Sequence, residues 1–273
     1  MKPRLSLEHI TAWGLPPDAF IGLAAALECE AVSLFLEAPV PESAGPPVAT
    51  DAVLRREVKA RLNDTGVRLH TIECFALAPE TDVGAFAPAL EAGADLGGVA
   101  ATAIVFDPDR ARTEDRLGQL ADLAHGFGLG VNVEFIAQSP LPSLSQAVAL
   151  VEKVGRPGLG IVVDSLHWTR SGGTVEELRA LDPALVGWIQ FCDGPREMPV
   201  ELQLFHEGFL QRQIPGEGAF ALADFLGALP PDRVIGVEVP LKDLADQGVP
   251  VEERARRAVQ ATRDMLKRQG YAG

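Results

Sequence analysis

The sequence predicts an α/β protein with a (β/α)8 barrel fold, as a single domain that spans residues 1–273. Three observations indicate this fold. Short runs rich in Val, Ile and Leu alternate with helix-like segments along the whole chain. Four of these runs end in an oxygen-bearing side chain. The length of 273 residues is close to the ~250 that are typical of such barrels, and a hydrophobic content of 47% supports a large core.

The expected strands are short and continuously apolar, as strands buried on both faces of a parallel sheet should be. We place them at 4–8, 31–36, 67–73, 99–105, 129–135, 159–164, 185–191 and 233–239. One internal repeat supports the alternation, because GLGVNVE at 128–134 recurs as GLGIVVD at 158–164. A single repeat indicates two βα units in the same register and does not indicate a solenoid.

The expected helices follow the strands, at 17–28, 50–65, 83–96, 113–127, 143–155, 174–181, 219–228 and 250–268. Thr113 and Thr174 each precede two acidic residues within three positions, so we expect them to be N-caps. The longest irregular stretch is 192–218, and a βα loop of this length predicts a substrate lid. The Pro- and Gly-rich segment 38–49 is expected to form another wall at the same end of the barrel.

Composition and charge exclude several classes of protein. The net charge of −14 argues against binding to nucleic acid, which requires a basic surface. There is no run of 18 uncharged apolar residues to span a membrane, and the first six residues have no signal-peptide core. We therefore expect a cytoplasmic protein with a small-molecule substrate, and a homodimer is the default expectation. The three cysteines show no CxxC spacing, so neither a zinc knuckle nor a disulfide framework is predicted.

The four polar strand ends predict a metal site. Glu134, Asp164, Gln190 and Glu238 end the runs VNVE, IVVD, VGWIQ and VIGVE. In a parallel barrel the carboxyl ends of the strands surround one mouth, where the active site lies. Three carboxylates and an amide that converge there would offer oxygen ligands to a divalent cation. Glu134 and Glu238 could ligate it from opposite sides and leave room for a substrate between them.

Two histidines are candidates for substrate binding. His167 follows Asp164 by three residues and is expected to point into the same mouth. His70 lies in the strand that ends at Glu73, and either of these two residues could reach the pocket. The alternative for each histidine is a polar group held within the core.

Two arginines of the long loop are further candidates. Arg196 follows Gln190 by six residues, and Arg212 precedes the segment QIPGEG at 213–218. An arginine near a metal would pair with a carboxylate, a phosphate or a developing oxyanion of the substrate. The alternative for each arginine is an ion pair on the surface.

With these motifs in place, the chain resembles the sugar phosphate isomerase/epimerase family of the xylose isomerase-like TIM-barrel superfamily. The resemblance covers nearly the whole chain, and its specific motifs lie within 129–240. They are strand-end Glu134, VDSLH at 163–167, IQFCD at 189–193, Arg212 with PGEG at 215–218, and GVE at 236–238.

The resemblance implies roles for the candidate residues. Residues that match Glu134, Asp164, Gln190 and Glu238 bind Mn2+, Mg2+, Co2+ or Zn2+ in the family. Those that match the two glutamates are commonly also the bases that transfer the proton. Those that match His167 and Arg196 hold substrate hydroxyls or the enediolate oxygen.

Two departures from the family pattern refine the expectation. The third ligand is usually a histidine in sugar epimerases, whereas this chain has Gln190, as the similar hydroxypyruvate isomerases do. An amide oxygen is a harder ligand than imidazole, which favours Mg2+ or Mn2+ over Zn2+ or Co2+. The segment FIAQSP at 135–140 lacks the extra glutamate of ketose 3-epimerases, which argues against a 3-epimerase of free ketoses. The acidic charge argues against the endonuclease branch of the superfamily.

We therefore expect a divalent-metal-dependent isomerase or epimerase of a small hydroxy-carbonyl compound, with an enediolate intermediate. Glu134 or Glu238 would remove the α-proton, and His167 and Arg196 would steady the enediolate. Two alternatives stay open. A dehydratase that resembles inosose or dehydroshikimate dehydratase begins with the same proton abstraction, and a binding barrel without catalysis is the other.

Overall fold

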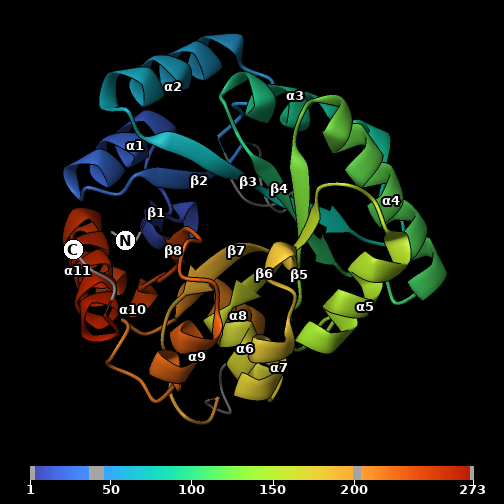
Figure 1. Cartoon of the computed structure of the whole chain (residues 1–273). Coiled ribbons are helices and arrows are strands. Elements are labelled where there is room, and N and C mark those ends of the chain that lie inside the picture. Colours follow the sequence, from blue (N-terminus) through green and yellow to red (C-terminus); the bar gives the residue numbers. More distant parts are fainter. Residues whose placement is uncertain (1–3, 37–45, 199–203, 271–273) are drawn as a thin grey trace.

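The eight apolar runs form eight parallel strands that pair in sequence order, and β8 closes the barrel against β1 (Figure 1). The computed structural model describes residues 4–36, 46–198 and 204–270. Its strands are β1 (Leu5–Leu7), β2 (Ala31–Phe35), β3 (Arg68–Leu77), β4 (Ala100–Val105), β5 (Gly130–Glu134), β6 (Leu159–Asp164), β7 (Val186–Phe191) and β8 (Ile235–Val237). The prediction of a (β/α)8 barrel is confirmed.

Helices surround the barrel and cover the apolar outer faces of the strands (Figure 1). The longer ones are α1 (Pro17–Ala26), α2 (Ala52–Thr65), α3 (Ala87–Asp95), α4 (Arg110–Gly126), α5 (Leu144–Val154) and α11 (Val251–Arg268). The shorter ones are α6 (Ser165–Arg170), α7 (Val175–Ala180), α8 (Leu204–Leu210), α9 (Leu222–Ala228) and α10 (Lys242–Asp246). No helix within the described residues is long and apolar enough to cross a membrane.

Local sequence explains several helix starts. Thr174 is the N-cap of α7 and forms a capping box with Glu177, as predicted in part. The prediction for Thr113 is wrong, because Asp109 caps α4 by accepting a hydrogen bond from the Arg112 amide at 3.0 Å. A carboxylate four residues earlier therefore starts the helix, and Thr113 is buried inside it.

Among the described residues, three α-helices were not expected from the sequence, namely α6, α8 and α10. Two of them matter for function, because α6 carries His167 and α8 leads into Arg212. Strand β3 also continues four residues beyond its expected end at Glu73. Most of the expected wall at 38–49 and residues 199–203 of the expected lid lie outside the described residues.

Strand register aligns the predicted site residues. Asp164 on β6 is paired with Gln190 on β7, and Gln190 is paired with Gly236 on β8. Glu134 on β5 is level with Val162, two residues before Asp164. The four strand ends therefore lie side by side at one end of the barrel.

Candidate metal and substrate site

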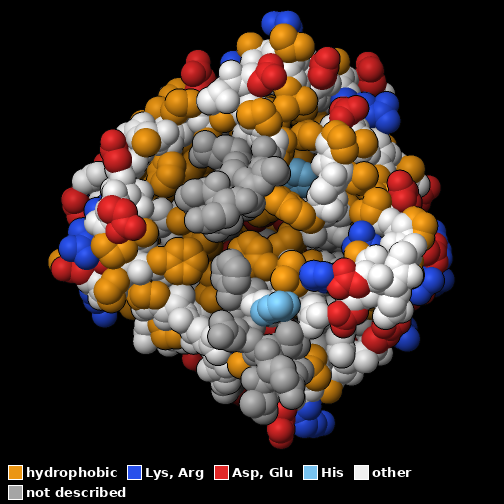
Figure 2. All heavy atoms as spheres, turned by 180° about the vertical axis from the view of Figure 1, so that it is seen from behind, with side chains coloured by type: hydrophobic (Ala, Val, Ile, Leu, Met, Phe, Trp, Pro, Cys, Tyr) orange, Lys and Arg blue, Asp and Glu red, His pale blue; other side chains and the backbone are white. Residues whose placement is uncertain are grey.

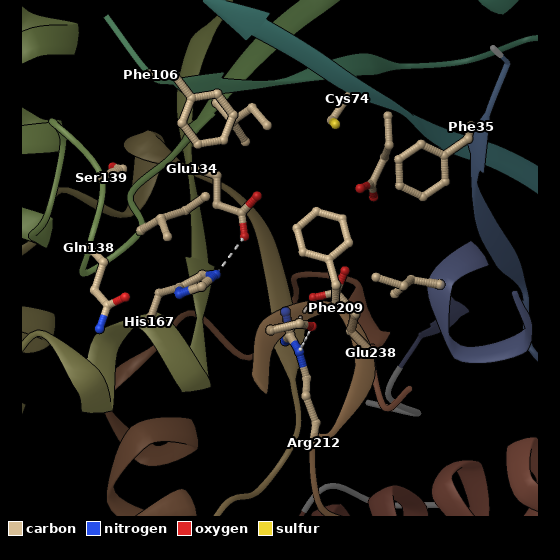
Figure 3. Close-up of a pocket in the computed structure, with 15 residues that line it drawn as sticks. Phe35, Cys74, Phe106, Glu134, Gln138, Ser139, His167, Phe209, Arg212 and Glu238 are labelled. Atoms are coloured by element: carbon tan, nitrogen blue, oxygen red, sulfur yellow. Dashed lines mark hydrogen bonds and ion pairs between the residues drawn. The ribbon is translucent and has the colours of Figure 1, made fainter. Parts of the chain in front are cut away.

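A cavity of about 160 Å3 opens at the carboxyl ends of the strands (Figure 3). Glu134, His167, Arg212 and Glu238 line it, as do residues that were not predicted from the sequence. Figure 3 shows their side chains converging on a common space from β5, α6, β8 and the loop that follows α8. The structure thus brings together most of the predicted site.

Glu134 ends β5 and is 8% exposed. Its Oε1 atom lies 3.4 Å from Nε2 of His167, which is in the first turn of α6. One ligand atom from each of Glu134, Asp164 and His167 lies within 4.8 Å of the other two. His167 therefore belongs to the cluster itself and is close enough to share a cation with the two carboxylates.

Asp164 is fully buried, and both of its carboxylate oxygens are engaged. As the N-cap of α6, it accepts a hydrogen bond at Oδ1 from the Leu166 amide at 2.6 Å. Its Oδ2 atom lies 2.6 Å from Nη1 of Arg212. The cap fixes the carboxylate in orientation, because one oxygen is held by the backbone while the other contacts Arg212.

Gln190 and Glu238 form a second linked pair. The Gln190 amide Nε2 donates a hydrogen bond to Oε1 of Glu238 at 3.1 Å. This leaves Oε1 of Gln190 buried and without a hydrogen-bond partner among the described residues. A buried carbonyl oxygen without a partner is energetically unfavourable. This atom could therefore accept a hydrogen bond or ligate a cation.

Arg212 lies between these groups. Its Nη1 atom is 2.6 Å from Asp164 Oδ2 and 2.8 Å from Glu238 Oε2, and its Nε donates to the Gly208 carbonyl at 2.8 Å. The arginine is 5% exposed. Its two carboxylate contacts show that this part of the mouth is built to hold positive charge.

Asp193 fixes the loop that carries Arg212. Residues Asp193 and Gln213 form an antiparallel bridge. The Asp193 carboxylate accepts hydrogen bonds of 2.8–3.1 Å from four backbone amides, those of Gly194, Gly216, Gly218 and Phe220. A Cβ atom at position 218 would lie 2.3 Å from Asp193 Oδ1, so this close approach requires glycine.

Two predicted substrate contacts, Arg196 and His70, do not line the cavity. The side chain of Arg196 is exposed, and its backbone carbonyl accepts a hydrogen bond from Arg170. His70 stacks on the ring of Trp188 with centroids 4.1 Å apart, and it lines a depression at the amino ends of the strands with Arg4. The placement of His70 at the mouth was therefore wrong, Arg196 does not line the cavity, and Glu73 and Cys74 are the residues of β3 that do.

Burial and nearby negative charges raise the pKa values of Glu134 and Glu238. Burial, with the nearby charge of Asp164, raises the pKa of Glu134 to about 8, although Arg212 opposes the shift. Burial also raises the pKa of Glu238 well above its usual value against the opposing effect of Arg212. Both glutamates are thus reluctant to ionise unless more positive charge enters the mouth.

The pKa values of Asp164 and His167 are lowered, in contrast to those of the two glutamates. Burial opposes ionisation of Asp164, yet its pKa stays below the usual value because Arg212 and His167 favour its charged form. Burial lowers the pKa of His167 to about 4. His167 is therefore neutral at pH 7, with one ring nitrogen as donor and the other as acceptor.

Two further carboxyl groups lie inside the barrel. Glu8 follows β1, is 0% exposed and accepts a hydrogen bond from the Trp188 indole at 3.3 Å. Glu73 lines the cavity, and its Oε1 has no hydrogen-bond partner among the described residues. Burial raises the pKa of both. Sequence reasoning missed Glu8 although it also ends an apolar run, because the run at 4–8 is short.

The donors present fit a divalent cation. Glu73, Glu134 and Glu238 are buried and line the cavity, Asp164 is buried behind Arg212, and Arg212 is the cation among the described residues of the lining. The high pKa values of the glutamates and the unpaired Gln190 oxygen indicate an excess of acceptors over donors. Carboxylate and amide oxygens with one imidazole suit Mg2+, Mn2+ or Zn2+.

Comparison with known proteins identifies the family. The profile of the xylose isomerase-like TIM barrel family matches residues 21–268. This chain belongs to that family. The match covers all of the strands that carry the mouth residues and most of the helices around them.

The curated proteins that match part of this sequence are enzymes. Inosose isomerase of Bacillus subtilis (strain 168) is 30% identical over 131 residues, which cover 46% of this chain and 44% of that protein. 3-Dehydroshikimate dehydratase of Pseudomonas aeruginosa is 30% identical over 141 residues, which cover 50% of this chain and 21% of that protein. The chain thus spans less than half the length of the curated relatives it matches.

Solved structures share the fold over nearly the whole chain. The IOLI protein, solved with a zinc atom bound, superposes with a TM-score of 0.81 at 19% identity and covers 97% of this chain and 98% of its own. D-allulose 3-epimerase from Methylomonas sp., solved with D-allulose, has a TM-score of 0.70 at 17% identity and covers 97% of both chains. At these identities the likeness concerns the fold.

Proposed function

We propose that this protein is a divalent-metal-dependent isomerase or epimerase of a small hydroxy-carbonyl compound. The observation that carries the proposal is the clustering of Glu134, Asp164 and His167 within 4.8 Å, beside the linked pair Gln190 and Glu238. Relatives that isomerise inosose or dehydrate 3-dehydroshikimate support chemistry at carbon beside a carbonyl.

Glu134, Asp164, Gln190 and Glu238 would hold the ion, with His167 next to it. A divalent cation in this cluster would supply Lewis acidity, which lowers the free energy of negative charge developing on substrate oxygens. The hard oxygen donors favour Mg2+ or Mn2+ over Zn2+ or Co2+ in this proposal.

The protein's own residues would move the proton. Glu134 and Glu238 approach the cavity from β5 and β8, so one carboxylate can take the α-proton and the same or the other can return it. The pKa of Glu134 is raised to about 8 in the metal-free protein, and a cation bound nearby would favour its ionised, proton-accepting form.

Neutral His167 and Arg212 would bind the substrate. His167 Nδ1 is buried without a hydrogen-bond partner among the described residues, and Nε2 faces Glu134. The imidazole can therefore contact a substrate hydroxyl and the proton-transferring glutamate together. Arg212 takes the role first assigned to Arg196, because its guanidinium lies at the mouth and can steady an oxyanion.

The experiment is proton exchange in D2O with Mn2+ present, followed by NMR on dihydroxyacetone, an inosose and 3-dehydroshikimate. We expect deuterium at the α-carbon of at least one ketone, and a loss of ~100-fold or more in Glu134→Gln. Glu80→Gln is the control, because Glu80 is exposed. Equal exchange in both variants, or none with any metal or ketone, would contradict the proposal.

A dehydratase is the second candidate, supported by the similarity to 3-dehydroshikimate dehydratase. After the same α-proton removal, a hydroxyl group on the β-carbon would leave as water. Glu73, a buried carboxyl whose pKa is raised well above its usual value by burial, could donate the proton that this step needs. The inosose and 3-dehydroshikimate samples discriminate the two outcomes, since dehydration lowers the mass of the product by one water and isomerisation conserves mass.

A further inference from the structure

The depression at the amino ends of the strands lies at the opposite end of the barrel from the mouth. Figure 2 shows the face of the mouth, where hydrophobic side chains gather around a central hollow. The amino-end depression has a different lining, because its polar side chains are those of Arg4, His70, Asn132 and Arg233. Its volume of about 350 Å3 lies at the lower end of the ~300–1,000 Å3 that is common for small-molecule sites.

Glycines on two neighbouring strands leave room for the side chain of Asn132 in this depression. A Cβ atom would lie 1.9 Å from Asn132 Oδ1 at position 187 on β7, and 2.5 Å from it at position 160 on β6. Only glycine therefore fits beside this amide. Asn132 is 5% exposed, and its amide makes no hydrogen bond to another described residue. A buried amide without a partner is unfavourable, so a polar ligand at this position would stabilise it.

The two arginines are held at the starts of adjacent strands. Arg4 precedes β1 and Arg233 precedes β8, and these two strands are paired. Nη2 of Arg4 donates to the Asp232 carbonyl at 2.7 Å, and Nη2 of Arg233 donates to the Pro183 carbonyl at 2.9 Å. These backbone contacts orient the guanidinium groups without neutralising them. Nε of Arg233 is buried and has no hydrogen-bond partner among the described residues.

The lining of the depression is positively charged, although the whole chain has a net charge of −14. None of the described residues that line it is acidic. The Asp232 carboxylate lies 3.8 Å from Nη1 of Arg233, but both side chains reach solvent, and such pairs contribute only ~0–1 kcal/mol. Burial, with the charges of Arg4 and Arg68, lowers the pKa of His70 to about 4. His70 is therefore neutral at pH 7, with one ring nitrogen able to donate a hydrogen bond.

From this geometry we propose that the amino-end depression binds the phosphate group of a small molecule. Two guanidinium groups match the charge of about −1.5 to −2 on a phosphate monoester better than the single charge of a carboxylate. The free Nε of Arg233, the His70 ring and the Asn132 amide supply hydrogen-bond donors for its oxygens. Apolar Val99 and Leu159 border the rest of the space.

Titration with inorganic phosphate, followed by NMR of protein labelled with 15N at histidine, tests the proposal. The His70 ring reports on the depression, and the His167 ring reports on the mouth. At pH 7 with a chelator present, we expect a saturable shift of the His70 signals with a dissociation constant of ~1 mM, and no shift at His167. A His70 signal that does not shift, or that shifts without saturating, would overturn the proposal.

Three variants assign the binding to the arginine pair. Arg233→Met should raise the phosphate dissociation constant ~tenfold or more, because one guanidinium is lost. Arg110→Met is the matched control, since the Arg110 side chain is 70% exposed at the start of α4. Asp232→Asn should lower the constant about twofold by removing a competing carboxylate, a gain that misfolding would not produce. Equal constants in the wild type, Arg233→Met and Asp232→Asn would overturn the proposal.

Acetate distinguishes a phosphate site from a site for any anion. Because acetate carries one charge and two oxygens, we expect it to bind at least ~tenfold more weakly than phosphate. Equal affinity for the two anions would overturn the assignment to phosphate. The depression shares no lining residue with the mouth cavity among the described residues, so this result is independent of the proposed function.

Discussion

Nη1 of Arg212 lies 2.6 Å from Oδ2 of Asp164 in the barrel mouth, and both side chains are buried. The same nitrogen is 2.8 Å from Oε2 of Glu238. One guanidinium thus holds two of the four predicted metal ligands in place before any ion enters. This arrangement joins the loop after α8 to strands β6 and β8.

Removing that guanidinium should destabilise the metal-free protein. We expect Arg212→Met to lower the free energy of unfolding by ~3–5 kcal/mol, because two buried carboxylates lose their charged partner. Urea denaturation in the presence of a chelator measures the effect. Arg156→Met is the control, because Arg156 and Asp122 form an exposed pair that is worth ~0–1 kcal/mol. Similar losses of unfolding free energy in the two variants would show that the ion pairs of Arg212 stabilise the protein no more than the exposed pair of Arg156 does.

Gln190→His should change which metal the mouth prefers. An imidazole nitrogen is a softer ligand than an amide oxygen and favours Zn2+ over Mn2+. We expect the ratio of the Mn2+ and Zn2+ dissociation constants to rise about tenfold, as competition titrations would measure. The exposed Gln119→His on α4 provides the control. An unchanged ratio would mean that residue 190 does not contact the ion.

Glu73 should make the metal-free protein less stable as pH rises. Burial raises its pKa well above the usual value, so the native state keeps this proton to a higher pH than the unfolded state does. The stability that such a group contributes is fully present below its unfolded pKa. It is lost at ~1.4 kcal/mol per pH unit as the pH rises from the unfolded pKa to the folded pKa. Glu73→Gln should therefore flatten the decline in unfolding free energy between pH 7 and 9.

The comparison for this pH profile is the exposed Glu80→Gln, which should follow the wild-type curve. Unfolding free energies from urea denaturation at pH 7, 8 and 9 provide the profile. A Glu73→Gln profile as steep as that of the wild type would indicate that the Glu73 carboxyl is already ionised at pH 7.

Asp193 should contribute more to the free energy of unfolding than an ordinary turn aspartate. Its carboxylate accepts hydrogen bonds from four backbone amides, so Asp193→Ala should cost roughly 3 kcal/mol of unfolding free energy. Asp182→Ala, which removes a single bond to the Ala184 amide, should cost only ~1 kcal/mol. Urea midpoints measure both, and equal costs would rule out a special role for Asp193.

The sequence predicts the barrel and most of its mouth for a simple physical reason. Strands buried on both faces give continuous apolar runs, and a polar residue that ends such a run lies at the mouth. Glu134, Asp164, Gln190 and Glu238 follow this rule: ligand atoms of Glu134 and Asp164 lie within 4.8 Å of each other, and Gln190 contacts Glu238, which Arg212 links to Asp164. His167 was found through its spacing from Asp164.

The remainder depends on loops and on strand continuation, which local patterns do not determine. Arg196 and Arg212 look alike in the sequence, and only the bridge between Asp193 and Gln213 places the second one at the mouth. Glu73 was taken as a strand end, whereas β3 continues to Leu77. Phe106, which lines the cavity, was missed because it follows its strand without a recognisable motif.

The most direct test of the metal site is Mn2+ binding to the wild type and to Glu238→Gln, measured by titration and elemental analysis. The exposed Glu91→Gln on α3 serves as the control. The account predicts one ion per chain, bound ~10–100-fold more weakly in Glu238→Gln and unchanged in the control. Absence of saturable binding, or equal affinity in all three proteins, would contradict it.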